Sequence, residues 1–324
     1  MKQLVILSGK GGTGKTSIAA AFAHLLSLDG VPLRAVFADA DVDASNLELV
    51  LAPRIIIREA FRGGLYAEIN WEICTGCGLC KEVCRFDAIN ARSMPKFHQQ
   101  MSHHYPESGM SGVQIQNLPL VDPIACDGCA ACYYQCPEGA ITMQDQIVGE
   151  WCRSESRYGP LFHAVLHPAQ ENSGKLVTLV KQQARLLAMD ENYDLVLVDG
   201  PPGIGCPVIA AASGADVALV VAEPTAAGVH DLQRVLETTN HFNIQTLVCI
   251  NKADIYSAGA TGIKSYCEDR GIQVVGKIPF DLAVTEAMVH GQPVTLYAPG
   301  SPSSKALLEV WGKVEAILHI EGKQ

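Results

Sequence analysis

The sequence has 324 residues, of which 48% are hydrophobic and 18% charged, and its net charge is −10. This length allows one large domain or two smaller ones, and the acidic balance argues against nucleic acid and anionic membranes as partners. No stretch is apolar and long enough to span a bilayer, and no export signal precedes the first predicted strand, so we expect a cytoplasmic protein.

The first predicted elements surround a glycine-rich segment. An apolar strand over Leu4–Leu7 precedes it, and a helix over Ser17–Leu28 follows. Residues 9–16 match the phosphate-binding pattern GxxxxGK[ST], in which glycines let backbone N–H groups close around phosphate oxygens. Lys15 is expected to reach the β- and γ-phosphates, and the Thr16 hydroxyl to ligate Mg²⁺. The expected nucleotide-binding residues here are Gly9, Lys10, Gly11, Gly12, Thr13, Gly14, Lys15, Thr16 and Ser17.

Apolar runs along the rest of the chain alternate with helical segments. Helices are predicted over residues 174–189 and 229–240, between short continuous apolar strands of the kind found in parallel sheets covered on both faces. These strands are Ala35–Ala38, Leu195–Val198, Val217–Ala222, Leu247–Ile250 and Val274–Lys277. The alternation predicts a doubly wound α/β domain over residues 1–65 and 146–324, with an insert over residues 66–145.

Eight of the twelve cysteines lie in the insert, in two runs of equal spacing. In a reducing compartment, grouped cysteines bind metal more often than they form disulfides. The spacing is that of bacterial two-cluster ferredoxins, in which the fourth cysteine of each run ligates the other cluster. The predicted ligand sets are Cys74, Cys77, Cys80 and Cys136 for one 4Fe–4S cluster, and Cys126, Cys129, Cys132 and Cys84 for the second. Zinc is the alternative, but its sites usually use two separated cysteine pairs.

The segment between the two cysteine runs predicts a loop. Residues 91–118 mix Ser, Gln, Pro, Gly and Met with three histidines, His98, His103 and His104. A metal site is the alternative interpretation of the histidines, although this composition is typical of a loop.

Lys10, early in the glycine-rich segment, resembles the second lysine of the deviant Walker A loop in MinD/ParA-family P-loop NTPases. The resemblance implies that Lys10 reaches across a dimer interface to the nucleotide of the partner. It also implies a switch I at Ala38–Asp43, where Asp41 would position or activate the attacking water and Asp39 would lie near Mg²⁺. A capped turn is the structural alternative for that segment.

Two further segments resemble nucleotide elements of this family. Leu195–Gly203 resembles Walker B running into switch II, with Asp199 holding Mg²⁺. Asn251–Asp254 resembles the NKxD base-binding segment, which implies that Asn251 contacts adenine with Asp254 beside it. A similar motif binds guanine in GTPases, but the early lysine favours ATP. Pro279 is expected to close over the base.

Two features remain outside these motifs. Cys206 follows Asp199 at a spacing similar to that of a cluster-bridging cysteine in the nitrogenase iron protein, and a small residue packed in a loop is the alternative. Residues 305–320 form an amphipathic pattern without a strongly basic face, so we expect a helix docked on the core rather than a membrane anchor.

The resemblance covers nearly the whole chain and is closest to MinD-superfamily ATPases with an inserted α+β ferredoxin-like domain. It implies a slow, partner-stimulated ATPase that binds ATP, Mg²⁺ and two 4Fe–4S clusters and forms a homodimer with ATP. We expect hydrolysis to gate electron transfer with an unidentified redox partner. The alternatives are a carrier that passes a cluster to an accepting protein, and a positioning ATPase.

Overall fold

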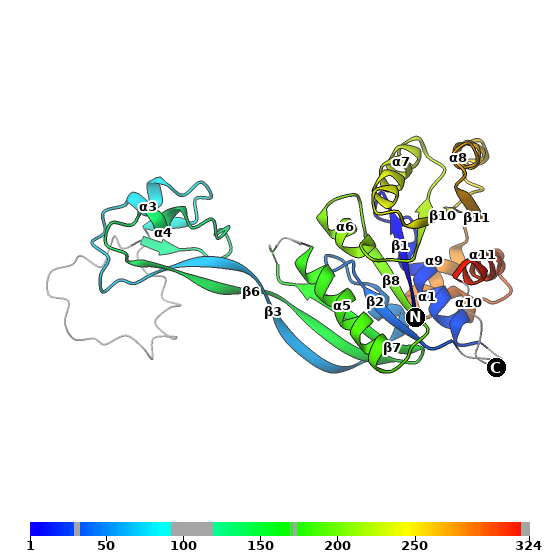
Figure 1. Cartoon of the computed structure of the whole chain (residues 1–324), viewed down its shortest axis with the longest axis horizontal. Coiled ribbons are helices and arrows are strands. Elements are labelled where there is room, and N and C mark those ends of the chain that lie inside the picture. Colours follow the sequence, from blue (N-terminus) through cyan, green and yellow to red (C-terminus); the bar gives the residue numbers. More distant parts are fainter. Residues whose placement is uncertain (29–32, 92–118, 169, 171–173, 319–324) are drawn as a thin grey trace. The chain divides into compact units, whose positions relative to one another are not determined.

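The computed structural model describes residues 1–28, 33–91, 119–168, 170 and 174–318. The predicted loop with its three histidines therefore lies outside the described residues, apart from Ala91. The chain divides into two compact units (Figure 1). Unit 1 comprises Met1–Phe61, Gly149–His167 and Glu171–Gln324, and unit 2 comprises Arg62–Val148 and Pro168–Gln170.

The sheet of unit 1 is mostly parallel, as predicted. Its nine strands follow the order β11-β10-β9-β1-β8-β2-β7-β6-β3. The parallel strands are β1 (Lys2–Ser8), β2 (Ala35–Asp39), β7 (Gly159–Leu166), β8 (Leu195–Pro202), β9 (Val217–Ala222), β10 (Gln245–Asn251) and β11 (Gln273–Ile278). β6 (Ile141–Ser156) pairs antiparallel with β7, and β3 (Arg54–Ile69) lies beside β6 at the edge.

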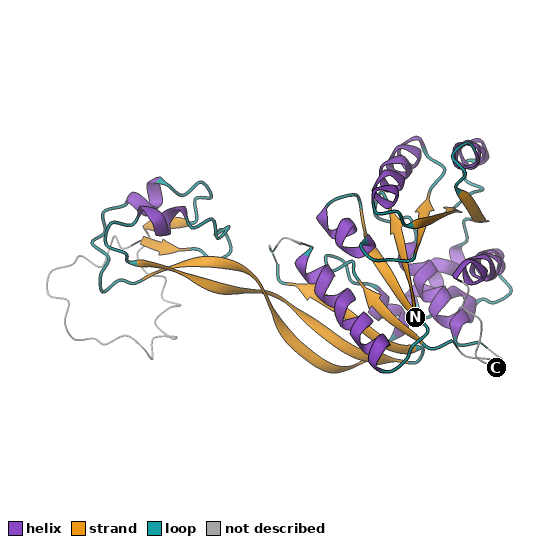
Figure 2. Ribbon diagram, in the orientation of Figure 1, coloured by secondary structure: helices purple, strands orange, loops and turns teal. Residues whose placement is uncertain are grey.

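Helices cover both faces of this sheet (Figure 2). One apolar cluster joins one sheet face to α1, α2, α9, α10 and α11, and a second joins the other face to α5, α6, α7 and α8. This arrangement confirms the doubly wound α/β fold class. The helices are α1 (Lys15–Leu26), α2 (Leu47–Leu51), α5 (Lys175–Asp190), α6 (Cys206–Ala212), α7 (Ala226–His241), α8 (Ser257–Glu268), α9 (Leu282–Val289), α10 (Val294–Tyr297) and α11 (Pro302–Leu318).

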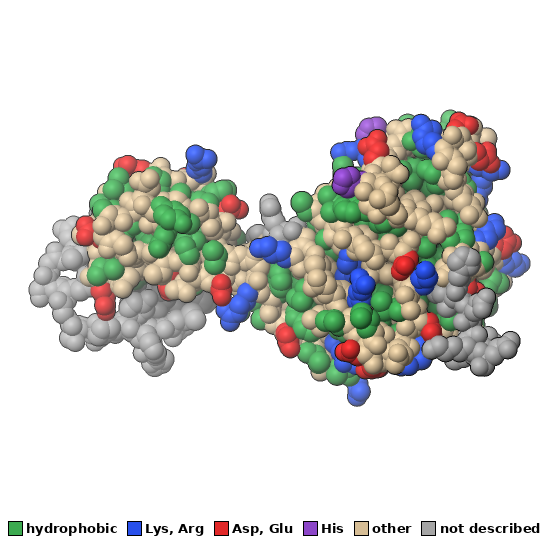
Figure 3. All heavy atoms as spheres, in the orientation of Figure 1, with side chains coloured by type: hydrophobic (Ala, Val, Ile, Leu, Met, Phe, Trp, Pro, Cys, Tyr) green, Lys and Arg blue, Asp and Glu red, His purple; other side chains and the backbone are tan. Residues whose placement is uncertain are grey.

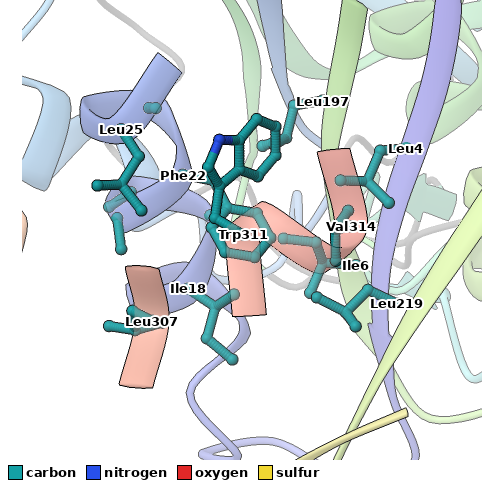
Figure 4. Packing of buried hydrophobic residues seen from close by; sticks show 14 of the residues in the cluster. Leu4, Ile6, Ile18, Phe22, Leu25, Leu197, Leu219, Leu307, Trp311 and Val314 are labelled. Carbon is teal, nitrogen blue, oxygen red and sulfur yellow. The ribbon is translucent and has the colours of Figure 1, made fainter. Parts of the chain in front are cut away.

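Helix α11 packs its apolar face into the core (Figure 4). The Trp311 ring lies 4.9 Å from that of Phe22 on α1, measured between centroids. Both side chains are at most 5% exposed, whereas Leu308 on the same helix is 56% exposed. The docked-helix interpretation therefore holds as far as Leu318, where the described part of α11 ends. None of the helices in the described ranges is long and apolar enough to cross a membrane.

Unit 2 contains both cysteine runs, together with residues 62–69 of β3 and 141–148 of β6. Its short helices are α3 (Leu79–Glu82) and α4 (Ala131–Gln135), and β4 (Ile89–Ala91) pairs antiparallel with β5 (Pro119–Val121). Gly78 and Ala130 precede the two helices, and both have a left-handed backbone. The two cysteine runs thus share one local fold: a loop, a left-handed residue and a helix of one turn.

Candidate functional site

The glycine-rich segment forms a loop between β1 and α1, and we refer to residues 9–16 as the P-loop. Gly14 has φ 95° and precedes the first residue of α1, Lys15. A left-handed residue with a Cβ is disfavoured here, and an added Cβ would also overlap the Asn251 amide. Gly9 has a different constraint, because a Cβ there would overlap Asp231 of α7. The loop is therefore fitted closely to α7 and to the end of β10.

Lys15 is buried at the base of this loop. Its Nζ donates to Ser8 Oγ at 3.0 Å, and Ser8 Oγ donates to the carbonyl of Lys10 at 2.7 Å. Burial lowers the Lys15 pKa, although the nearby acidic side chains of Asp199, Asp41 and Asp39 favour its charged form. The ammonium group therefore lies where helix α1 begins and where a phosphate would meet backbone N–H groups.

Two buried carboxyl groups lie beside each other at the ends of strands. Asp39 of β2 and Asp199 of β8 are partners in the parallel register, and they are 0% and 1% exposed. Burial raises the pKa of both groups, to about 7 for Asp199, and repulsion from Asp199 raises that of Asp39 further. Two acids in one buried position need protons or a cation to be neutralised.

The hydrogen-bond partners of these two groups differ. Asp39 accepts from Ser45 Oγ at 2.8 Å, from the Leu47 N–H at 3.0 Å and from the Asp41 N–H at 3.2 Å. Among the described residues, neither carboxyl oxygen of Asp199 has a hydrogen-bond partner of good geometry. The Thr16 hydroxyl nevertheless lies close enough to favour its ionised form. An unpartnered carboxylate beside a hydroxyl is a donor set that suits Mg²⁺.

Asp41 lies next to this pair with a partly buried side chain. Burial raises its pKa, Lys15 lowers it and Asp43 raises it again. Its backbone N–H donates to Asp39, so Asp39 fixes the chain at the predicted switch I. The structure thus brings together four of the predicted residues, Lys15, Asp39, Asp41 and Asp199.

Glu223 was missed by the sequence reasoning. Its Oε2 lies 2.6 Å from Lys10 Nζ, and its Oε1 lies 2.5 Å from Lys252 Nζ. Lys252 Nζ also donates to the Gly12 carbonyl at 3.1 Å. Glu223 directly follows the strand predicted over 217–222, and its position at the carboxyl end of a parallel strand is the signal that could have found it.

The predicted base-binding segment supports the P-loop directly. Asn251 Nδ2 donates to the Thr13 carbonyl at 2.7 Å, and its Oδ1 accepts from the Lys252 N–H at 2.9 Å. Asp254 Oδ1 accepts from the Phe280 N–H at 2.7 Å and so holds the turn that follows Pro279. The Asn251 amide is engaged by the protein itself, and its contact with adenine stays a prediction.

Lys181, another residue missed from the sequence, holds the far end of α6. Its Nζ donates to the carbonyls of Ala210 and Ala211, and to that of Ser213 at 2.5 Å. Burial lowers the Lys181 pKa to about 8. Cys206, at the first position of α6, is exposed. The segment from Asp199 to Cys206 therefore leads into a helix that is anchored at its other end.

The cysteines of unit 2 line two small cavities. Cys84, Cys126, Cys129 and Cys132 line one, which we call the Cys84 cavity. Cys74, Cys77, Cys80 and Cys136 line the other, the Cys136 cavity. Each cavity thus has three cysteines of one run and the fourth of the other run.

The cysteines that line each cavity affect one another's ionisation. Burial raises the pKa of Cys80 and Cys132, and repulsion from the other two cysteines of the same triplet raises it further. The Ala140 N–H donates to Cys136 Sγ at 3.3 Å. Within the described ranges, no three His, Cys, Asp or Glu side chains are arranged to hold a single metal ion.

A doubly wound sheet with a P-loop between β1 and α1 and carboxylates ending the adjacent strands defines a P-loop nucleotide-binding protein. The model of the CobQ/CobB/MinD/ParA nucleotide-binding domain matches residues 4–294. The chain belongs to this family.

The chain is also similar to individual proteins. An uncharacterised protein of Methanocaldococcus jannaschii is 29% identical over 98% of this chain and 97% of its own length. An iron–sulfur cluster carrier protein of Pyrococcus furiosus is 29% identical over 46% of this chain and 55% of its own length. The septum site-determining protein MinD of Pyrococcus horikoshii, solved with Mg-ADP, has a TM-score of 0.56 and 18% identity over 100% of this chain and 99% of its own. That likeness shows the fold alone.

Proposed function

We propose that this protein binds and hydrolyses ATP, pairs with a second copy when ATP is bound, and couples its nucleotide state to electron transfer by two 4Fe–4S clusters. The observation that carries the proposal is the lining of the two cavities, because each collects one complete predicted ligand set. The ATPase part rests on the family and on the grouping of Lys15, Asp41 and Asp199 at the P-loop.

The nucleotide part assigns a role to each residue of the site. Lys15 and the P-loop N–H groups bind the phosphates, and Thr16 and Asp199 would hold a Mg²⁺ ion, which would neutralise part of the phosphate charge. Asp41 orients the attacking water. The water oxygen then bonds to the γ-phosphorus as the bond from that phosphorus to the bridging oxygen breaks. The products are ADP and phosphate, with one water proton kept on the phosphate and the other released to solvent. Lys10 reaches across the dimer interface and contacts the nucleotide bound by the second copy.

The cluster part concerns residues 66–145, which we propose to be a ferredoxin-like domain. Unit 2, which contains these residues, supports that assignment by its compactness. The Cys136 cavity would hold one cluster and the Cys84 cavity the other, each able to accept and release a single electron. Figure 3 displays hydrophobic side chains on the visible face of unit 2. Among the apolar side chains of this unit, Tyr134 is 80% and Ile124 66% exposed. Exposed apolar side chains near the clusters suit transient contact with a redox partner.

The test compares the cluster reduction potentials of anaerobically purified protein with ADP and with a non-hydrolysable ATP analogue. We expect the potentials to shift between the two states, with dimerisation measured in the same samples. Equal potentials in a protein that dimerises with ATP would exclude the coupling. A protein that contains iron but binds no nucleotide would exclude the ATPase part.

The similarity to the Pyrococcus carrier protein favours a second candidate, a carrier that passes a cluster to an accepting protein. Ligation of both clusters by cysteines alone suits stable clusters and so favours electron transfer. Incubation of the loaded protein with an apo-ferredoxin distinguishes the two functions. Rapid appearance of the acceptor's spectrum, with equal loss of iron from the donor, would identify a carrier.

A further inference from the structure

Glu223 is the one carboxylate that contacts Lys10 in the described part of the chain. Its two oxygens are divided between two cations, with Lys10 on Oε2 and Lys252 on Oε1. Lys10 belongs to the P-loop, and Lys252 contacts the same loop through the Gly12 carbonyl. Glu223 therefore holds both lysines at the place where phosphate oxygens would bind.

This arrangement is partly shielded from water. The Glu223 side chain is 10% exposed and that of Lys10 is 36% exposed. Burial opposes ionisation of Glu223, but the hydrogen bonds and charges of Lys10 and Lys252 outweigh it and lower the Glu223 pKa. A charged pair with one buried partner is screened less than a surface pair. Separating Lys10 from Glu223 therefore has a measurable cost.

We propose that Glu223 is a positioning residue that holds Lys10 against its own chain, and that dimerisation with ATP requires the triphosphate of the second copy to displace this carboxylate. The inference rests on the proposed function, which supplies the dimer and the crossing of Lys10. The inference adds that the Glu223 carboxylate and the triphosphate of the second copy compete for the Lys10 ammonium group. Glu223 thereby sets the protein concentration at which the ATP-bound dimer forms.

Lys252 gives Glu223 a partner when Lys10 leaves. Its backbone is left-handed, with φ 53°, which is uncommon for a residue with a Cβ. This conformation accompanies the two contacts of its ammonium group, with Glu223 and with the Gly12 carbonyl. A buried carboxylate without a counter-ion would be costly. Because Lys252 stays in place, the release of Lys10 leaves no unpaired charge at the end of β9.

The test measures the dimer dissociation constant by sedimentation velocity, with saturating Mg²⁺ and a non-hydrolysable ATP analogue. Glu223→Gln keeps the shape of the side chain and removes its charge. We expect this variant, with both proteins saturated with the analogue, to dimerise about fivefold more tightly than the wild type. Glu268→Gln is the matched control, because Glu268 pairs with Lys264 on the exposed side of α8.

A double variant shows whether the effect passes through Lys10. In a Lys10→Met background, Glu223→Gln should change the dimer dissociation constant by less than about twofold. If the wild type dimerises and Glu223→Gln has the same dimer dissociation constant, the inference is overturned but the proposed function stands. Equal tightening in both backgrounds would also overturn it. A wild-type protein that stays monomeric with the analogue would refute the proposed dimer itself.

Discussion

Asp39 and Asp199 occupy the same register of two adjacent parallel strands, and both side chains are shut off from solvent. Asp39 accepts three hydrogen bonds from residues that follow it within the next eight positions, whereas Asp199 has no partner of good geometry among the described residues. One carboxylate of the pair therefore organises the chain, and the other is left for a ligand.

The first prediction concerns pH. Because burial raises the Asp199 pKa to about 7, the folded protein binds more protons than the unfolded chain between about pH 4 and 7. The contribution of Asp199 to the free energy of unfolding therefore falls as the pH rises through that window. Over the same window the affinity for Mg²⁺ rises, because Mg²⁺ binds the ionised carboxylate. We expect Mg²⁺ to enhance nucleotide binding about tenfold more at pH 8 than at pH 6.

Calorimetric titrations at the two pH values test this, after subtraction of the Mg²⁺ affinity of the free nucleotide. Asp199→Asn should lose the pH dependence and be more stable than the wild type at pH 8, by about 1–3 kcal/mol, because it removes a buried charge. The same enhancement at both pH values in the wild type would contradict the assignment of Asp199 to Mg²⁺.

The second prediction separates the two P-loop lysines. Lys15→Ala should weaken nucleotide binding roughly a hundredfold, because a buried, charge-assisted contact to the phosphates is lost. Lys10→Ala should leave binding to the monomer within about threefold, since its ammonium group contacts Glu223 instead. Hydrolysis by Lys10→Ala should no longer rise with protein concentration. Normal concentration-dependent hydrolysis in this variant would disprove the crossing of Lys10.

The third prediction concerns iron content. The wild type, purified without oxygen, should contain about eight irons per chain, and Cys129→Ser should retain about four, because one cavity loses a ligand. Cys152→Ser is the matched control, since Cys152 is a buried cysteine in unit 1. Iron and sulfide assays give the result. Unchanged iron in Cys206→Ser would exclude a bridging cluster, and full iron in Cys129→Ser would contradict the predicted ligand set.

The fourth prediction uses two glycines of the same loop. Gly9→Ala should destabilise the nucleotide-free protein by about 1–3 kcal/mol, because the new methyl group overlaps Asp231 of α7. Gly11→Ala should be nearly neutral for stability, because nothing lies within 4 Å of its added Cβ. Urea unfolding of both variants provides the comparison. Equal stability of the two would show that the loop and α7 are not closely packed.

The fifth prediction tests the docking of α11. Trp311→Ala should lower the free energy of unfolding by about 3–5 kcal/mol, because it empties the space beside Phe22. Leu308→Ala on the same helix should cost much less, since Leu308 is 56% exposed. Thermal unfolding measures both. A small loss for Trp311→Ala would mean that α11 contributes little to the core.

The elements that could be predicted from the sequence are those with continuous apolar runs or a periodic pattern of apolar residues. The strand over 195–198 is a continuous apolar run, and such runs allowed the parallel sheet to be anticipated. β3 was not predicted, because most of its residues, including Ile55, Ile56 and Ile57, are exposed and it lies at a sheet edge. Pairing with a neighbouring strand, rather than burial, stabilises such a segment, and pairing leaves little periodicity in the sequence.

The same contrast applies to the candidate site. The grouping of the cysteines around two cavities and the place of Lys15 in the P-loop could be anticipated, because both belong to motifs with a fixed spacing along the chain. Glu223 and Lys252 are 29 residues apart, and their contact depends on neighbouring strands that end at the same edge of the sheet. Long-range pairs of this kind need the topology, which the motifs alone do not supply.

The grip of Lys181 on the end of α6 has a mechanical consequence. The Lys181 ammonium group donates to three carbonyls and so holds that end of the helix in place. A shift of the backbone at Asp199 would then have to be taken up by residues between Asp199 and that end of α6. Gly203 lies in this segment and has a left-handed backbone, with φ 98°. The opposite end of α6 is packed as well, because a Cβ on Gly174 would lie 3.2 Å from the Cys206 carbonyl oxygen. A change in backbone conformation between Asp199 and Cys206 would therefore be confined to the turn around Gly203.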